Sequence, residues 1–278
     1  MKNTCTEIVP AIYPKAKRIV AIGDIHGDYN SLLQIFTHAK ILKNNKFVAR
    51  DTHIVIVGDF LDRGARRLNA DDERSEYKII KLLFKMMHVA KKYNSHVCIC
   101  LGNHEIMNVL GDFSYVSPEG NKDFDGRRHE YMKPGGKIAK LLACKTNTIV
   151  KIGSWLFSHA GVKSEISNKY KLTEVNHIIR EFLLGNTEYP VRPIFKRLFW
   201  HRSFGGRKPN CEDSNKSAGN YNTVRQVIGH TVQRSGINVA CDEKLFRIDV
   251  GLSRAFYKNP RIQYLEIIND DNYYLHKL

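Results

Sequence analysis

Residues that could bind metal ions or transfer protons follow short apolar runs at five places in the sequence. Asp24 and His26 come directly after the apolar run 19–22, and Gly23 and Gly27 allow the chain to turn there. The other four places read Gly58-Asp59-Phe60-Leu61-Asp62-Arg63-Gly64, Gly102-Asn103-His104-Glu105, His159-Ala160-Gly161 and Gly229-His230-Thr231. In an open α/β sheet, ligands bind beyond the carboxyl ends of the strands. The residues that follow the five apolar runs, here called the five strand endings, can therefore converge on one site. A mixed set of oxygen and imidazole groups suits manganese, iron or zinc better than magnesium or calcium.

The elements that must position these residues are strands and helices that alternate along most of the chain. Strands are predicted at about residues 18–22, 53–57, 97–101, 148–152, 155–158, 227–229, 238–240, 244–249 and 261–267. Helical spacing of apolar residues predicts helices at about 72–93 and 137–143, at 32–39 after a cap at Asn30 or Ser31, and from Thr173 or Asn176 to Leu183. The pattern is typical of an α/β fold.

We expect one domain over residues 1–278, because the five strand endings extend over most of the chain and no linker separates them. A segment of about 111–147 interrupts the strand rhythm with glycines, charges and the turn Pro134-Gly135-Gly136. We interpret this segment as an insertion beside the mouth of the site. Residues 203–220 are rich in glycine, serine, asparagine and charge, which predicts a mobile loop over the pocket.

The composition gives the chain a net positive charge, because lysine and arginine exceed aspartate and glutamate by 16. This charge would attract a phosphoprotein, a nucleic acid or an acidic membrane surface, and it would also serve solubility alone. No compact basic block and no zinc-finger or RNA-recognition motif occurs, so a nucleic acid is not expected as a specific partner.

The cysteines and the apolar segments bear on location. None of the six cysteines forms a CxxC pair, and Cys98 and Cys100 lie inside an apolar strand pattern, so we expect all six to be reduced and structural. No apolar stretch reaches the length of a membrane span, and the first residues lack the apolar core of a secretory signal. A cytoplasmic protein is therefore expected, with its oligomeric state open.

The five strand endings together resemble the motifs of the calcineurin-like metallophosphoesterases, and within them those of the phosphoprotein phosphatases. The motifs GDIHG, GDFLDRG, GNHE, HAG and GHT lie between Gly23 and Thr231 in the order of that family. Leu101 precedes GNHE where eukaryotic Ser/Thr phosphatases usually have arginine, HAG replaces HGG, and their C-terminal tyrosine-containing signature is missing. The run from Gly102 to Asp112, with Leu198-Phe199-Trp200-His201-Arg202, is similar to the Shewanella-like branch. The resemblance implies a βαβαβ sandwich of two mixed sheets flanked by helices.

The resemblance also implies a site for two divalent or trivalent metal ions, with manganese, iron or zinc as the candidates. The metal ligands that it implies are Asp24, His26 and Asp59 for one ion, and Asp59, Asn103, His159 and His230 for the other. Asp59 would bridge the two ions. A water between two cations would be deprotonated near neutral pH and would attack phosphorus directly, without a phosphorylated enzyme intermediate.

Six further residues receive roles from the resemblance or from their position. His104 would donate a proton to the leaving oxygen, and Asp62 would hold its imidazole. Arg63 would clamp the phosphate oxygens with its planar guanidinium, and Arg202 is the candidate for a second phosphate-binding arginine. Arg66 and Arg67 would add positive charge at the rim.

Three functions remain open from the sequence. The first is a protein phosphatase acting on phosphoserine, phosphothreonine or phosphotyrosine. The second is a nucleotide or dinucleoside-polyphosphate hydrolase of the same superfamily, because fold alone does not separate the two. The third is a scaffold that binds phosphate without turnover, which the complete set of implied ligands disfavours.

Overall fold

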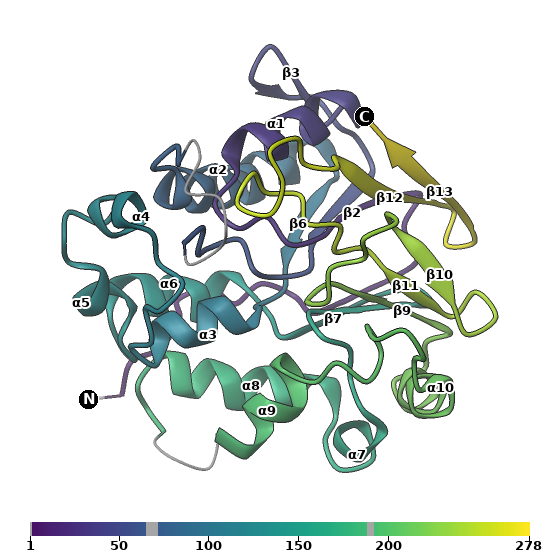
Figure 1. The fold of residues 1–278 in the computed structure, drawn as a ribbon. Helices are drawn as coiled ribbons and strands as arrows, with labels where there is room; N and C mark the ends of the chain where they lie inside the picture. Colours follow the sequence, from purple (N-terminus) through teal and green to yellow (C-terminus); the bar gives the residue numbers. More distant parts are fainter. Residues whose placement is uncertain (1, 65–71, 188–191) are drawn as a thin grey trace.

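The computed structural model describes residues 2–64, 72–187 and 192–278, and in it two mixed β-sheets pack against each other with helices on their outer faces (Figure 1). The five-stranded sheet has the order β13 (Asn272–Lys277), β12 (Gln263–Ile268), β2 (Arg18–Ile22), β5 (Thr52–Ile56) and β6 (His96–Ile99). The six-stranded sheet has the order β1 (Ile12–Tyr13), β7 (Ile149–Ile152), β8 (Trp155–Ser158), β9 (Arg225–Ile228), β11 (Leu245–Arg247) and β10 (Asn238–Ala240). A separate hairpin joins β3 (Leu42–Lys43) to β4 (Lys46–Phe47).

Two groups of parallel strands carry the motifs. In the first sheet β2, β5 and β6 are parallel, and in the second β8, β9 and β11 are parallel. The strands that precede the motifs within each group therefore end at the same edge of their sheet. This arrangement is the one that the sequence predicted, and the α/β fold with two mixed sheets is confirmed.

Apolar side chains alternate between two cores along the central strands. In β2, Ile19 and Ala21 belong to the core between the sheets, whereas Val20 and Ile22 pack with the helices on the outer face. All four are fully buried, as expected for a strand covered on both faces.

Helices cover the outer faces of both sheets (Figure 1). The helices within the described residues are α1 (Tyr29–His38), α2 (Glu76–Ala90), α3 (Asn103–Val109), α4 (Pro118–Lys122), α5 (Arg128–Met132), α6 (Lys137–Lys145), α7 (Ser164–Ser167), α8 (Leu172–Leu183), α9 (Arg192–Phe199) and α10 (Cys211–Asn220), with a 3₁₀ turn at Lys91–Tyr93. Across the described part of the chain, no helix combines the length and the apolar character that a membrane crossing requires.

The predicted strands and helices all have counterparts, but several details differ. The N-cap of α1 is Asp28, whose carboxylate accepts the backbone N–H of Ser31 at 3.0 Å, so the predicted caps Asn30 and Ser31 are wrong. Strand β13 was not predicted. It follows a tight turn in which Asn269 and Asp270 adopt left-handed backbone angles, a signal that the sequence Asn-Asp-Asp did carry.

The segment 203–220 is not a continuous loop, which corrects the sequence prediction. Its second half is α10, and the side chain of Asn210 caps this helix by accepting the N–H of Asp213 at 3.1 Å. Gln226 of β9 also donates to the carbonyl of Ser214 at 2.8 Å. The composition concealed the helix because serine, asparagine and glycine have low helix propensity, and tertiary contacts decided the outcome.

The segment 111–147 forms α4, α5 and α6, and α6 confirms the predicted helix at 137–143. Tyr115 of this segment lies edge-on to the ring of His104, and the status of the segment as an insertion stays a prediction. Arg66 and Arg67 lie outside the described residues.

Four of the six cysteines form disulfides, so the expectation that all are reduced is wrong. Cys5 pairs with Cys144 across 139 residues, and Cys211 pairs with Cys241 across 30 residues. Only the fold brings these partners together, which is why no local spacing revealed them. Cys98 and Cys100 are free and buried, as predicted.

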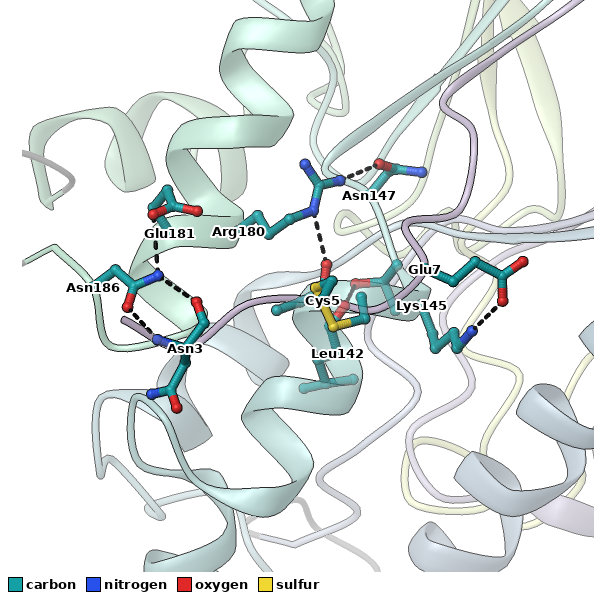
Figure 2. The surroundings of a disulfide bond; sticks show 12 residues. Asn3, Cys5, Glu7, Leu142, Lys145, Asn147, Arg180, Glu181 and Asn186 are labelled. Atoms are coloured by element: carbon teal, nitrogen blue, oxygen red, sulfur yellow. Dashed lines mark hydrogen bonds and ion pairs between the residues drawn. A yellow bond between two sulfur atoms is a disulfide. The ribbon is translucent and has the colours of Figure 1, made fainter. Parts of the chain in front are cut away.

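The Cys5–Cys144 bond ties the N-terminal segment to the end of α6, and further polar contacts hold the same segment (Figure 2). The side chain of Asn186 accepts the backbone N–H of Asn3 at 3.0 Å and donates to its carbonyl at 2.7 Å. The carboxylate of Glu7 accepts from Lys145 at 3.0 Å. The disulfide therefore reinforces a segment that is also attached by hydrogen bonds.

Candidate active site

All six predicted metal ligands lie at the carboxyl ends of strands, and all six are buried. Asp24 and His26 follow β2, Asp59 follows β5, Asn103 begins α3 after β6, and His159 and His230 follow β8 and β9. The structure thus brings together residues that are up to 206 positions apart, as in the contact of Asp24 with the backbone N–H of His230.

The turns that carry these residues are tight and partly strained. His26, Asp59 and His230 have positive φ angles of 43°, 46° and 65°. Such angles are uncommon for residues other than glycine and occur often at functional sites. Gly102 and Gly229 lie so close to the carboxylates of Asp59 and Asp24 that a Cβ atom at either glycine would collide with them. The glycines of the motifs are therefore required for the close approach of neighbouring turns.

The ring of His159 shows why this cluster fits a cation. Its Nδ1 donates to the carbonyl of Val57 at 3.0 Å, so in the neutral ring Nε2 carries a lone pair. That Nε2 lies 3.2 Å from Oδ2 of Asp59, 2.9 Å from Oδ1 of Asn103 and 3.2 Å from Nδ1 of His230. A metal ion would satisfy this convergence of electron-rich atoms, whereas the one proton that Nε2 can accept would not.

Further observations agree with a metal centre. Ligand atoms of Asp59, His159 and His230 lie within 4.8 Å of one another, and Nε2 of His230 is buried with no hydrogen-bond partner among the described residues. Burial and the neighbouring His159 lower the pKa of His230 to about 2, which keeps the imidazole in its neutral, metal-binding form. The donor set thus fits the metal ions that the sequence predicted, whose identity it does not decide.

A second group contains His26, Asp59 and His104, whose ligand atoms also lie within 4.8 Å of one another. Asp59 belongs to both groups, as a bridging carboxylate should. The carboxylate of Asp24 lies outside both groups and accepts the backbone N–H of His230 at 2.9 Å. Burial and the charges of Asp249 and Asp59 raise the pKa of Asp24 well above its usual range. A nearby cation would relieve this repulsion.

His104 and Asp62 form the pair that the sequence predicted. Nδ1 of His104 lies 2.9 Å from Oδ2 of Asp62, and both residues are buried. Because Asp62 holds Nδ1, the other ring nitrogen, Nε2, faces the cluster and lies 3.9 Å from Oδ2 of Asp59. The aromatic ring of Tyr115, from the segment 111–147, lies edge-on to His104 with 4.9 Å between ring centroids.

The two predicted phosphate-binding arginines border the same cluster. Arg63 is buried, donates to the carbonyl of Gly27 at 3.3 Å and lies 3.6 Å from the carboxylate of Asp28. Arg202 is exposed and donates to the carbonyl of His230 at 2.9 Å. The Arg202 guanidinium is thus held against the candidate ligand His230, and the Arg63 guanidinium is held against Gly27 and Asp28, which directly follow His26 in the chain.

Sequence reasoning gave no role to two buried carboxylates of the site. Glu105 accepts the backbone N–H groups of Asp59, Phe60, Leu61 and Gly102 at 2.8–3.1 Å and so fixes the turn that carries Asp59. Asp249 follows β11 and accepts the N–H of Gly251 at 2.9 Å, and burial together with the charge of Asp59 raises its pKa to about 6. Asp249 lies two residues beyond the end of a strand, as Asp24 does, so the same signal could have found it.

Comparison with known proteins agrees with this geometry. The sequence pattern described as "Calcineurin-like phosphoesterase" matches residues 17–264. The chain is 29% identical to Shewanella-like protein phosphatase 2 of Arabidopsis thaliana, over 89% of this chain and 74% of that protein. It is 30% identical to Shewanella-like protein phosphatase 1 of Plasmodium berghei, over 90% of this chain and 71% of that protein.

A solved structure shows the same fold. The cold-active protein-tyrosine phosphatase of a psychrophilic Shewanella species superposes with a TM-score of 0.78 and 22% identity, over 97% of this chain and 83% of that one. Together with the family match, this fold and the cluster at the strand ends show that the chain belongs to the calcineurin-like metallophosphoesterases and is a phosphatase.

Proposed function

We propose that this phosphatase is a protein phosphatase with a two-metal centre, which hydrolyses phosphorylated side chains of proteins by direct attack of an activated water. The observation that carries the proposal is the His104–Asp62 pair beside the two groups that share Asp59. The relatives named protein phosphatases support a phosphoprotein as the substrate.

The proposed metal ligands are Asp24, His26, Asp59, Asn103, His159 and His230. Two bound cations would supply Lewis-acid polarisation of the phosphoryl group and activation of a water. Hydrogen bonds within the protein support two of these ligands, because Glu105 fixes the Asp59 turn and the Val57 carbonyl orients the ring of His159.

The protein's own groups would act on the substrate as follows. His104, oriented by Asp62 at Nδ1, donates a proton from Nε2 to the leaving oxygen. Arg63 and Arg202 hold the non-bridging phosphate oxygens, and their fixed positive charge stabilises the negative charge that develops in the transition state. Proton donation matters most for serine and threonine esters, since alkoxides are poor leaving groups.

The test is a comparison of substrates with the metal-loaded protein. Phosphopeptides with phosphoserine, phosphothreonine or phosphotyrosine should be turned over faster, in kcat/KM, than diadenosine tetraphosphate. Faster hydrolysis of the dinucleotide would favour the nucleotide hydrolase. Binding of phosphopeptide without turnover, at full metal content, would favour the scaffold.

The cytoplasmic location that the sequence predicted stays a proposal, and one observation argues against it. The two disulfides count against a strongly reducing compartment, since such bonds form mainly in oxidising ones.

A further inference from the structure

A buried arginine outside the predicted site lies behind the His104–Asp62 pair. Arg128 of α5 is 1% exposed, and its guanidinium makes four hydrogen bonds. Nε donates to Oδ1 of Asn108 at 2.6 Å, and Nη1 donates to the carbonyl of Gly120 at 3.1 Å. Nη2 donates to Oδ1 of Asp62 at 2.9 Å and to Oε2 of Glu76 at 2.7 Å. The group is therefore fixed in its plane by four separate acceptors.

The two oxygens of Asp62 are divided between this arginine and the proton donor. Oδ2 faces Nδ1 of His104, and Oδ1 accepts from Arg128 and from Nδ2 of Asn108 at 2.8 Å. Rotation of the carboxylate about its terminal bond would break these contacts together. The orientation of the His104 ring thus depends on donors located on the far side of Asp62.

We propose that Arg128 is a positioning residue for catalysis, which holds Asp62 and through it orients His104 for proton donation. The inference rests on the proposed function of His104. It assigns a role to the segment 111–147, because α5 delivers this guanidinium to the site. Glu76 of α2 and the ring of Phe124, 4.8 Å from Cζ of Arg128, hold the arginine in turn.

Only arginine suits this position. Its planar fork presents N–H groups in fixed directions to Asn108, Asp62 and Glu76, whereas a lysine ammonium is a single point with three donors. The positive charge also separates two buried carboxylates, Asp62 and Glu76, which would otherwise repel each other. Arg128→Lys therefore keeps the charge and loses the geometry.

The test compares two substrates in full-length, metal-loaded protein. For Arg128→Lys we expect kcat for a phosphoserine peptide to fall about tenfold or more, a fraction of the roughly hundredfold to ten-thousandfold that general acid catalysis contributes. For 4-nitrophenyl phosphate, whose leaving group needs no proton, we expect little change. An equal loss on both substrates, or no loss on either, would overturn the inference.

The matched control is Arg180→Lys. Arg180 of α8 is also buried, and it donates to the carbonyl of Ala143 at 3.0 Å and to Oδ1 of Asn147 at 3.3 Å, neither of which belongs to the His104–Asp62 pair. This substitution should leave the ratio of the two rates unchanged. If the ratio changes as much as in Arg128→Lys, the effect comes from the loss of any buried arginine and not from the contact with Asp62. That result would overturn the inference.

A double variant separates this inference from the function on which it rests. If Arg128 acts through His104, Arg128→Lys should add no further loss to His104→Asn on the phosphoserine peptide. Additive losses would overturn the positioning role. If His104→Asn itself slows both substrates equally, the proposed role of His104 fails first. Should Arg128→Lys not fold, Asn108→Ala removes the Nδ2 group that donates to Oδ1 of Asp62 and should give the same selective loss on the phosphoserine peptide. An equal loss on both substrates would refute the positioning role.

Discussion

Removal of the Cys5–Cys144 disulfide, by the paired substitution Cys5→Ser and Cys144→Ser, should destabilise the protein mainly by freeing the unfolded chain. The bond joins residues 139 positions apart, and the loop-entropy relation then gives about 5 kcal/mol at 25 °C. The folded state should change little, because Asn3 still bonds Asn186 and Glu7 still bonds Lys145 (Figure 2). The Cys211–Cys241 bond spans 30 positions and should contribute less, about 4 kcal/mol.

The assay is unfolding in urea without reductant, for the wild type and for each paired variant. Both variants should unfold at lower urea concentration than the wild type, and the loss should be greater for the Cys5 and Cys144 pair. Thiol titration of the denatured, unreduced wild type should detect only Cys98 and Cys100. Detection of six thiols would refute the disulfides themselves. Stability equal to the wild type in both variants would refute the entropic reasoning.

Four other expectations can be tested directly. Asp59→Asn should lower metal content, measured by mass spectrometry, more than the loss of His230, because Asp59 belongs to both candidate groups; near-normal content and rate would contradict the bridging role. His104→Asn should slow alkyl phosphates by about two to four orders of magnitude and nitrophenyl phosphate much less; equal losses would indicate a structural role. Burial and the charge of His96 lower the pKa of His53 to about 4, below the roughly 6.5 of the unfolded chain, so its stabilising contribution is present above pH 6.5 and is lost as the pH falls towards 4. The free energy of unfolding of His53→Phe, measured in urea, should therefore depend less on pH between 6.5 and 4 than that of the wild type. An unchanged pH dependence would show that His53 does not cause it. Phosphopeptide kcat/KM should fall only modestly from low to physiological salt while nucleic-acid affinity falls about a thousandfold or more; specific nucleic-acid binding that survives, without phosphopeptide turnover, would contradict a phosphoprotein partner.

The sequence predicted the parallel strands and the residues that follow them because these signals are local. The buried run 19–22 and the turn with Asp24 and His26 are neighbours in the chain, so one apolar pattern places both. Helix α10 was not predicted, because its residues have low helix propensity. Hydrogen bonds that involve the side chains of Asn210 and Gln226 stabilise it in the structure. Strand β13 has four exposed and two partly buried residues and none that is fully buried, so its apolar pattern was weak.

The residues that support the site were hidden for a different reason. Arg128 lies in a polar segment whose composition resembles any surface loop, and only the tertiary fold reveals that it is buried between Asp62 and Glu76. A ligand must have a particular chemistry and a particular place after a strand, and a motif records both. A supporting residue needs only to reach the side of the site that faces away from the ligands. It can come from a segment of any length or position in the sequence, so no motif marks it. Support for the ligands is therefore found by following each buried polar atom to its partner, as the oxygens of Asp62 lead to Arg128.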